Sequence, residues 1–397
     1  MSFVLIILKR KQKIEFTSML IKKFESYLRL ILILGFISPV LTVSQTNPKF
    51  NVNLTLDYSA AEQCLSLFQD QPVNTQQIAA LRGNRVAAST TGLISDNLNA
   101  TGDLSNYLDS LKYHQIIYKD IYHLEEARRN TLEIKQLLEE LKKRNFSKRV
   151  TATVEQIFPD DAEVSIDIPV FIVALGHENV DAYVRRIIWH GDYPEFTGND
   201  KGELTIVVNL SSAVRYGSDV DERFISLLGV VAHEVFHAAF GNYKENSSSW
   251  KEYYAKPQSP IDALLDLTQN EGIAYYLSLE QQGGGYLPRD WYDKTRNAFA
   301  DFNKYSFALL SDTITNKTAF DLLRKANLSG YWNSYGSITG MVMAREIDRQ
   351  IGRGSIIEAI SKNPFYFFRK YKELTEKDTN LPKFSKRLNS YVLTNFE

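Results

Sequence analysis

The stretch GVVAHEVFHAAFG (Gly229–Gly241) decides the fold, and it holds two of the six histidines in this chain of 397 residues. On an α-helix His237 lies about 40° from His233 around the axis, and Glu234 lies about 100° from it. Four apolar side chains of this segment and the residues just before it fall on the opposite side, between about 160° and 220° (Phe224, Leu228, Val231 and Val235). The pattern therefore predicts a helix that buries one face and presents two imidazoles and a carboxylate on another.

The limits of this helix can be predicted from the residues that flank it. Asp219 or Asp221 is placed to cap the N-terminus, and Gly241 is placed to end the helix. Two histidines one turn apart are separated by about 6 Å along the axis, so their rings can converge on one zinc ion at about 2.0–2.1 Å per bond.

A catalytic zinc needs a third protein ligand and an open position. The segment LTQNEGIAYYLSLE supplies a candidate in Glu271, 34 residues after His237. Pro260 is placed to begin this second helix after Ser259. A carboxylate in such an apolar helix needs a partner to justify its burial, and zinc would supply one. We therefore predict His233, His237 and Glu271 as zinc ligands, with Glu234 beside the metal as the base that takes a proton from water.

These two motifs carry a family resemblance. HEVFH followed by NEGIAYY resembles the gluzincin metallopeptidases, in which one helix supplies two histidine ligands and a later helix supplies a glutamate. The chain also resembles, over roughly residues 159–372, a bacterial family of proposed zinc-dependent peptidases. The resemblance implies an α+β, zincin-like fold, mostly helical with a small sheet before the zinc-binding helix. No aminopeptidase-type anchoring motif lies upstream, so that specificity does not carry over.

The resemblance also implies how a substrate would be held. The strand just before the zinc helix is often a sheet edge with which an extended peptide pairs, and Gly202–Leu210 is the candidate here. A tyrosine on a third helix often steadies the tetrahedral intermediate, which points to Tyr335 first and Tyr331 second. The expected function is peptide-bond hydrolysis with zinc as cofactor. The alternative is a non-catalytic zinc-bearing binding or assembly module at the cell envelope.

Composition excludes several other classes. The chain carries 46 basic and 47 acidic residues, so its net charge of −1 gives no electrostatic basis for nucleic-acid binding. A single cysteine, Cys64, excludes an intramolecular disulfide and any thiolate-rich metal site. The absence of a Gly-x-Ser-x-Gly motif leaves serine hydrolysis without a visible nucleophile.

Residues 1–44 read as a signal peptide for export. A basic flank precedes an apolar run at 28–41, which has Pro39 near its end, and small residues follow. This run is short for a membrane span, although a retained membrane anchor through 28–41 is the alternative. Met19 is the better natural start, since beginning there gives a conventional signal. The segment carries seven of the basic and two of the acidic residues, so the remainder is mildly acidic.

The rest of the chain divides into two regions by its sequence pattern. Residues 45–149 are predicted as a helical N-terminal region, with amphipathic spacing and Glu–Lys pairs. Residues 150–397 are predicted as the zincin-like metallopeptidase domain, with β-branched strands in Ala162–Gly176 and Gly202–Ser212 followed by helices.

Overall fold

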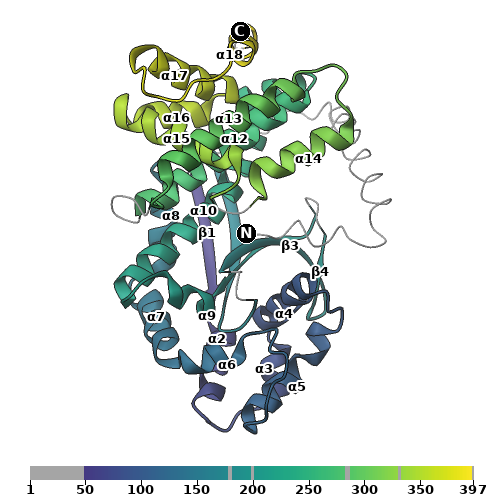
Figure 1. The fold of residues 1–397 in the computed structure, drawn as a ribbon. Helices are drawn as coiled ribbons and strands as arrows, with labels where there is room; N and C mark the ends of the chain where they lie inside the picture. The colour runs from purple at the N-terminus through teal and green to yellow at the C-terminus, as the bar shows by residue number, and fades with distance from the viewer. Residues whose placement is uncertain (1–48, 178–180, 198–200, 282–286, 330–331, 396–397) are drawn as a thin grey trace, which may run out of the picture.

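The computed structural model describes residues 49–177, 181–197, 201–281, 287–329 and 332–395. The predicted signal peptide, 1–44, lies outside these residues. The described chain is mostly helical, with one five-stranded mixed sheet whose strands all precede the helix that carries His233 and His237 (Figure 1). The predicted α+β class is confirmed.

The sheet has the strand order β1-β2-β5-β3-β4. Its strands are β1 (Phe50–Asp57), β2 (Val164–Val173), β3 (Ala182–His190), β4 (Tyr193–Phe196) and β5 (Glu203–Asn209). Strands β1, β2 and β5 run parallel, with Leu54 opposite Ile168 and Val170 opposite Ile206. Strand β3 is antiparallel to β5 and forms a hairpin with β4.

The prediction that Gly202–Leu210 is an edge strand is wrong. Strand β5 is bonded on both sides, to β2 and to β3, so its backbone is not open to a substrate strand. The edges of the sheet are β1 and β4. The β3–β4 hairpin lies before β5 in the sequence but outside it in space, and this placement is what covers the expected edge.

The prediction that residues 45–149 form a helical region is wrong at its start, because β1 lies within them. In β1 the buried Val52 and Leu54 alternate with exposed Asn51, Asn53 and Thr55. The strand pairs with β2, so the predicted N-terminal region contributes an edge to the sheet of the following region. The boundary near 149 stays a prediction.

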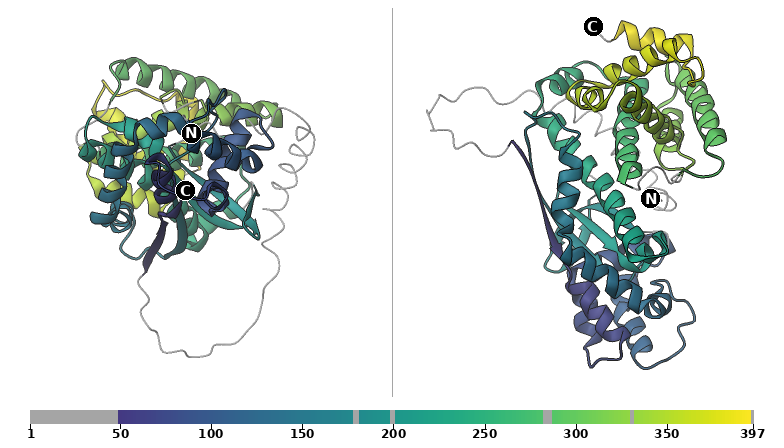
Figure 2. Two further views of the ribbon diagram at one scale, coloured as in Figure 1. Left: turned by 90° about the horizontal axis from the view of Figure 1, so that it is seen from below. Right: turned by 90° about the vertical axis from the view of Figure 1, so that its left-hand side faces the viewer.

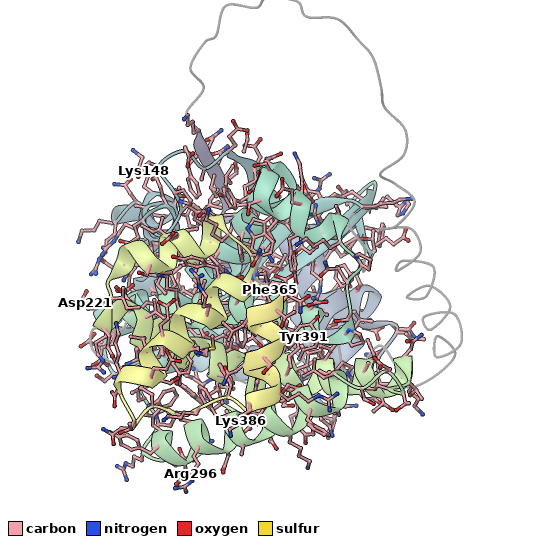
Figure 3. The ribbon with its side chains drawn as sticks, turned by 90° about the horizontal axis from the view of Figure 1, so that it is seen from above. Lys148, Asp221, Arg296, Phe365, Lys386 and Tyr391 are labelled. Carbon is pink, nitrogen blue, oxygen red and sulfur yellow. The ribbon has the colours of Figure 1, made fainter. Side chains whose placement is uncertain are left out.

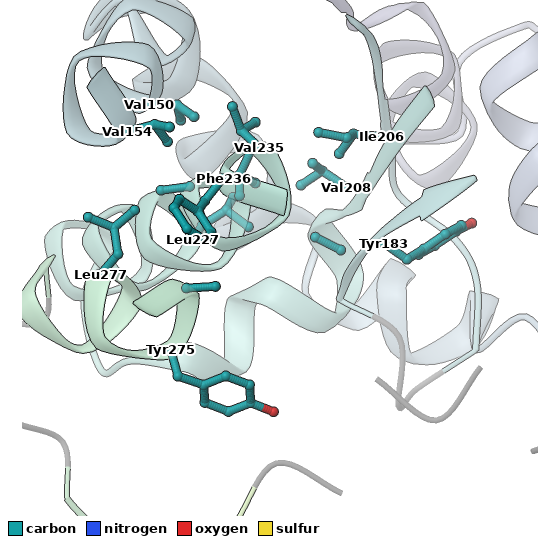
Figure 4. Close-up of a cluster of buried hydrophobic side chains, with 14 of the residues drawn as sticks. Val150, Val154, Tyr183, Ile206, Val208, Leu227, Val235, Phe236, Tyr275 and Leu277 are labelled. Carbon is teal, nitrogen blue, oxygen red and sulfur yellow. The ribbon is translucent and has the colours of Figure 1, made fainter. Parts of the chain in front are cut away.

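Helices cover both faces of the sheet. The helices before β2 are α2 (Ser59–Phe68), α3 (Thr75–Ala80), α4 (Arg82–Ser95), α5 (Ala100–Lys112), α6 (Leu124–Arg129), α7 (Thr131–Lys143) and α8 (Phe146–Glu155). Helices α2 and α4 pack on the face that carries Phe171 and Val173. Helix α8 and the long helix α10 (Val220–Asn246) pack on the opposite face, which carries Ile206 and Val208 (Figure 4).

Helix α10 begins where the sequence predicts and ends later. Asp219 caps it by accepting the backbone N–H of Glu222 at 2.9 Å. The predicted end at Gly241 is wrong, because the helix continues to Asn246. Buried Lys244 explains the extension, since its ammonium pairs with Asp266 and lies 4.3 Å from the ring centroid of Trp250. Tertiary packing outweighs the roughly 1 kcal/mol helix penalty of one glycine.

The C-terminal helices form a second helical layer at the other end of the molecule from α3 and α5 (Figure 2). Between β5 and this layer lie α9 (Leu210–Ala213), a 3₁₀ turn (Val214–Tyr216), α10 and α11 (Ser248–Ala255). The layer itself comprises α12 (Pro260–Gln281), α13 (Trp291–Leu309), α14 (Asn316–Asn327), α15 (Tyr335–Gln350), α16 (Arg353–Ser361), α17 (Pro364–Lys377) and α18 (Lys386–Thr394). Phe365 of α17 faces Tyr391 of α18 (Figure 3), and the Tyr391 hydroxyl donates to Asp262 of α12 at 2.8 Å.

Helix α12 is the link between this layer and the rest. It begins at Pro260 as predicted, and Asp262 accepts from both the backbone N–H and the hydroxyl of Ser259. Its side chain Leu277 joins Phe236 and Leu227 of α10 in the apolar cluster that Figure 4 shows. The core therefore runs without a break from the sheet through α10 to α12.

One helix among the described residues, Val220–Asn246, is long and apolar enough to cross a membrane. In its most apolar window 61% of the residues are buried inside the protein, as in the core helix of a globular domain.

Candidate metal centre

Helices α10 and α12 pack closely enough to bring their polar side chains together. A Cβ added at Gly229 would lie 2.8 Å from the backbone carbonyl oxygen of Ser278, so the two backbones nearly touch at this point. One turn further along α10 comes His233, and another turn further comes His237. Glu271 reaches the same place from α12.

Three ligand atoms converge at the centre of this contact. The Nε2 atoms of His233 and His237 are 3.0 Å apart, and Glu271 Oε2 lies 3.8 Å from the first and 3.6 Å from the second. Neighbouring ligand atoms around a tetrahedral zinc are about 3.4 Å apart, given bonds of about 2.0–2.2 Å. The structure thus brings together the three residues predicted as ligands, at separations that fit one small metal ion.

The other polar atoms of these side chains already have hydrogen-bond partners. His237 Nδ1 lies 3.2 Å from the Asn270 amide oxygen, to which it can donate, and this contact leaves Nε2 as the ring nitrogen that faces His233 and Glu271. His233 has a hydrogen bond with the backbone of Ala274. Glu271 Oε1 accepts from Asn327 Nδ2 at 2.8 Å. Partners of this kind fix the tautomers and orientations of ligands in metalloproteins.

Burial and mutual contact set the charges of the cluster. Burial lowers the pKa of His233, and the neighbouring His237 lowers it further. Burial also opposes a charge on His237, but the carboxylate of Glu271 raises the pKa of that imidazole. Burial alone would raise the pKa of Glu271, yet His237, His233 and the hydrogen bond from Asn327 together lower it. The cluster therefore holds an ionised carboxylate and a neutral imidazole, which is the donor chemistry that zinc prefers.

Glu234 differs from Glu271 in its surroundings. It is half-buried on α10, and burial raises the pKa of its carboxyl group. Within the described part of the chain, its carboxylate has no hydrogen bond or ion pair, whereas Glu271 has both. A carboxylate that is near the cluster but not engaged by it is available for proton transfer.

The structure does not bring Tyr335 to the cluster. Its side chain is buried, its hydroxyl donates to the backbone carbonyl of Leu322 at 3.1 Å, and its ring packs against Phe302 and Tyr305. These contacts make it a packing residue of the helical layer. The second choice, Tyr331, lies outside the described residues.

Sequence reasoning missed the hydrogen-bond partners of the three clustered residues. Asn270 stands beside Glu271 in the NEGIAYY motif, so its place on the helix could have indicated a contact with His237. Asn327 is 56 residues away from Glu271, and no local pattern marks it. Tyr275, whose ring centroid is 4.9 Å from that of His233, reads in the sequence as one more apolar-face residue.

Comparison with known families places the chain. Residues 76–380 match the family described as "Putative zinc dependent peptidase (DUF5700)". The chain belongs to this family. The DUF5700 match includes α10, α12 and α14, and hence all three clustered residues and Asn327. The family description indicates zinc dependence, in agreement with the donor set. No curated protein and no solved structure matches the chain.

Proposed function

We propose that this protein is a gluzincin-type zinc metallopeptidase, in which His233, His237 and Glu271 hold the ion and Glu234 is the general base. One observation carries the proposal. The two Nε2 atoms and Glu271 Oε2 lie within 4.8 Å of one another, while the remaining polar atoms of the same side chains are hydrogen-bonded elsewhere. The family match supports the peptidase class.

A zinc ion bound here would polarise the scissile carbonyl and lower the pKa of water at the site. The protein supplies the proton transfers. Glu234 accepts a proton from the attacking water and later delivers it to the leaving amine. It thus acts first as the general base and then as the general acid. The raised pKa of Glu234 suits both halves of that cycle.

The expected substrate is a peptide or protein, and the expected location is outside the cytoplasm. Both follow from the sequence features above, namely the gluzincin motifs and the signal-like segment 1–44. A form anchored through 28–41 would carry the same site on the outer side of the membrane. No membrane contact is needed by the metal site itself.

The decisive experiment combines metal analysis with cleavage of a peptide library. We expect one zinc per chain in the wild type and in Glu234→Gln, because Glu234 is not among the three clustered ligands. The variant should lose about 10²–10⁴-fold in kcat/KM, the range that a general base contributes.

The matched control is Glu245→Gln, the same change at an exposed position of the same helix, which should leave the activity intact. Absence of stoichiometric zinc from the wild type would refute the metal site. Full activity of Glu234→Gln would refute the base. Zinc binding without cleavage of any peptide would favour the non-catalytic alternative.

A further inference from the structure

We propose that Asn327 is a positioning residue of the metal centre, one that selects which oxygen of Glu271 faces the metal. The inference rests on the proposed function, since it takes Glu271 as a ligand. Asn327 is the last residue of α14, a helix that contributes no ligand itself.

The two oxygens of the Glu271 carboxylate have different surroundings. Oε1 accepts a hydrogen bond from Asn327 Nδ2 at 2.8 Å. Oε2 is the oxygen that faces the imidazoles, at 3.8 Å from His233 Nε2 and 3.6 Å from His237 Nε2. A carboxylate free to rotate would exchange the two oxygens or offer both. The hydrogen bond from the Asn327 amide holds Oε1 in place and leaves Oε2 as the single ligand atom.

A second hydrogen bond supports the orientation of the amide. The Ser337 hydroxyl donates to Asn327 Oδ1 at 3.4 Å, and it also lies 3.4 Å from the backbone carbonyl of Ala326. With Oδ1 accepting from a hydroxyl, Nδ2 is the atom that remains to face Glu271. An amide in the reverse orientation would place its oxygen against a carboxylate oxygen, which is repulsive.

Close packing holds the end of α14 in place. A Cβ added at Gly336 of α15 would lie 3.0 Å from both Cβ and the carbonyl oxygen of Ala326. A Cβ at this position would have to push the residue before Asn327 aside by a few tenths of an ångström, and glycine avoids this shift. The position of Asn327, and through it the orientation of Glu271, is therefore set by a contact between two helices that contribute none of the clustered ligands.

The test is metal affinity in purified full-length protein, measured by competition with a chromophoric zinc chelator. We expect Asn327→Ala to weaken zinc binding about 10–100-fold, the usual effect of removing a partner of a metal ligand. Asn316→Ala is the matched control, because Asn316 is exposed at the other end of the same helix. It should bind zinc as tightly as the wild type.

Cobalt substitution separates a positioning role from a merely structural one. We expect the visible d–d bands of the Co²⁺ form to change in energy and intensity in Asn327→Ala, since the carboxylate can then shift or bind through both oxygens. Thermal unfolding of the metal-free Asn327→Ala variant checks that it is folded. If it is not folded, Asn327→Leu takes its place, because leucine keeps the branched shape of the side chain and removes the hydrogen bond.

The outcomes distinguish the two proposals. A wild type that binds neither zinc nor cobalt would overturn the proposed function, and the role of Asn327 with it. A wild type that binds zinc, together with a folded Asn327 variant of equal affinity and unchanged cobalt spectrum, would overturn the role of Asn327 alone.

Discussion

Replacing Gly340 with alanine should damage both the stability of the protein and its metal centre, although Gly340 is on a helix that supplies no clustered ligand. A Cβ at this position would lie 2.0 Å from the backbone carbonyl oxygen of Thr268 and 2.8 Å from the Cα of Gly272. Ordinary van der Waals contact begins at 3.4 Å, so the first separation is too short by 1.4 Å. Both neighbours are backbone atoms, and neither can rotate out of the way.

The magnitude follows from this overlap. Helix α15 must move away from α12 by about an ångström, and overpacking of this kind typically costs about 1–3 kcal/mol in the free energy of unfolding. For a chain of this size, with an unfolding entropy of roughly 2 cal/mol/K per residue, each kcal/mol lowers the melting temperature by about 1–1.5 °C. The contact lies on α12 beside Glu271, so the same movement displaces the ligand. A shift of about 1 Å in a ligand is comparable with half a metal–ligand bond, and we expect zinc affinity to fall at least tenfold.

The assay is thermal unfolding of the metal-free protein together with zinc titration of Gly340→Ala. The control is Gly354→Ala, at an exposed helical position of α16 where an added Cβ meets no atom within 4 Å. That variant should be as stable as the wild type or slightly more so, because alanine is the better helix former. If Gly340→Ala melted and bound zinc like Gly354→Ala, the close contact of α12 with α15 would not position Glu271, and the reasoning would be wrong.

Two further substitutions test other parts of the structure. Tyr335→Phe should reduce the free energy of unfolding by about 1 kcal/mol, because the hydroxyl loses its hydrogen bond to the Leu322 carbonyl, and should leave kcat unchanged. A hundredfold fall in kcat would instead restore the predicted role at the oxyanion. Lys244→Met should lower the free energy of unfolding, measured in urea, by about 2–3 kcal/mol. This is somewhat less than the usual cost of a broken buried ion pair, because the Asp266 side chain is 22% exposed and still accepts a hydrogen bond from the Tyr254 hydroxyl. An unchanged urea midpoint would show that this pair contributes nothing.

The three clustered residues that we propose as metal ligands could be predicted from the sequence because their signal is local. His233 and His237 are one turn apart on a helix whose other face is apolar, so the sequence alone places both rings on one side. Glu271 could be found because a carboxylate in an apolar helix is costly without a partner. In each case the physical requirement acts within a few residues of the chain.

The strand order could not be found in this way, because it depends on contacts between distant segments. Strand β5 looks like an edge when only its position before α10 is considered. Strand β3 covers it, and two arginines in the middle of AYVRRIIWH make this strand hard to recognise from the sequence. Arg185 is tolerated there because its guanidinium lies over the rings of Tyr183 and Phe196. Strand β1, by contrast, carries a clear alternation in FNVNLTLD that could have been recognised.

The contacts between α10 and α12 explain how the three clustered side chains are positioned. The helices run antiparallel, and Gly229 meets Ser278 at one end of their contact while Lys244 meets Asp266 at the other. His233 and His237 lie between these two points, opposite the turn of α12 that carries Glu271. Because backbone approach fixes one end and a buried ion pair fixes the other, neither helix can slide or rotate without breaking a contact outside the site. The geometry of the three clustered side chains is therefore a consequence of the helix packing.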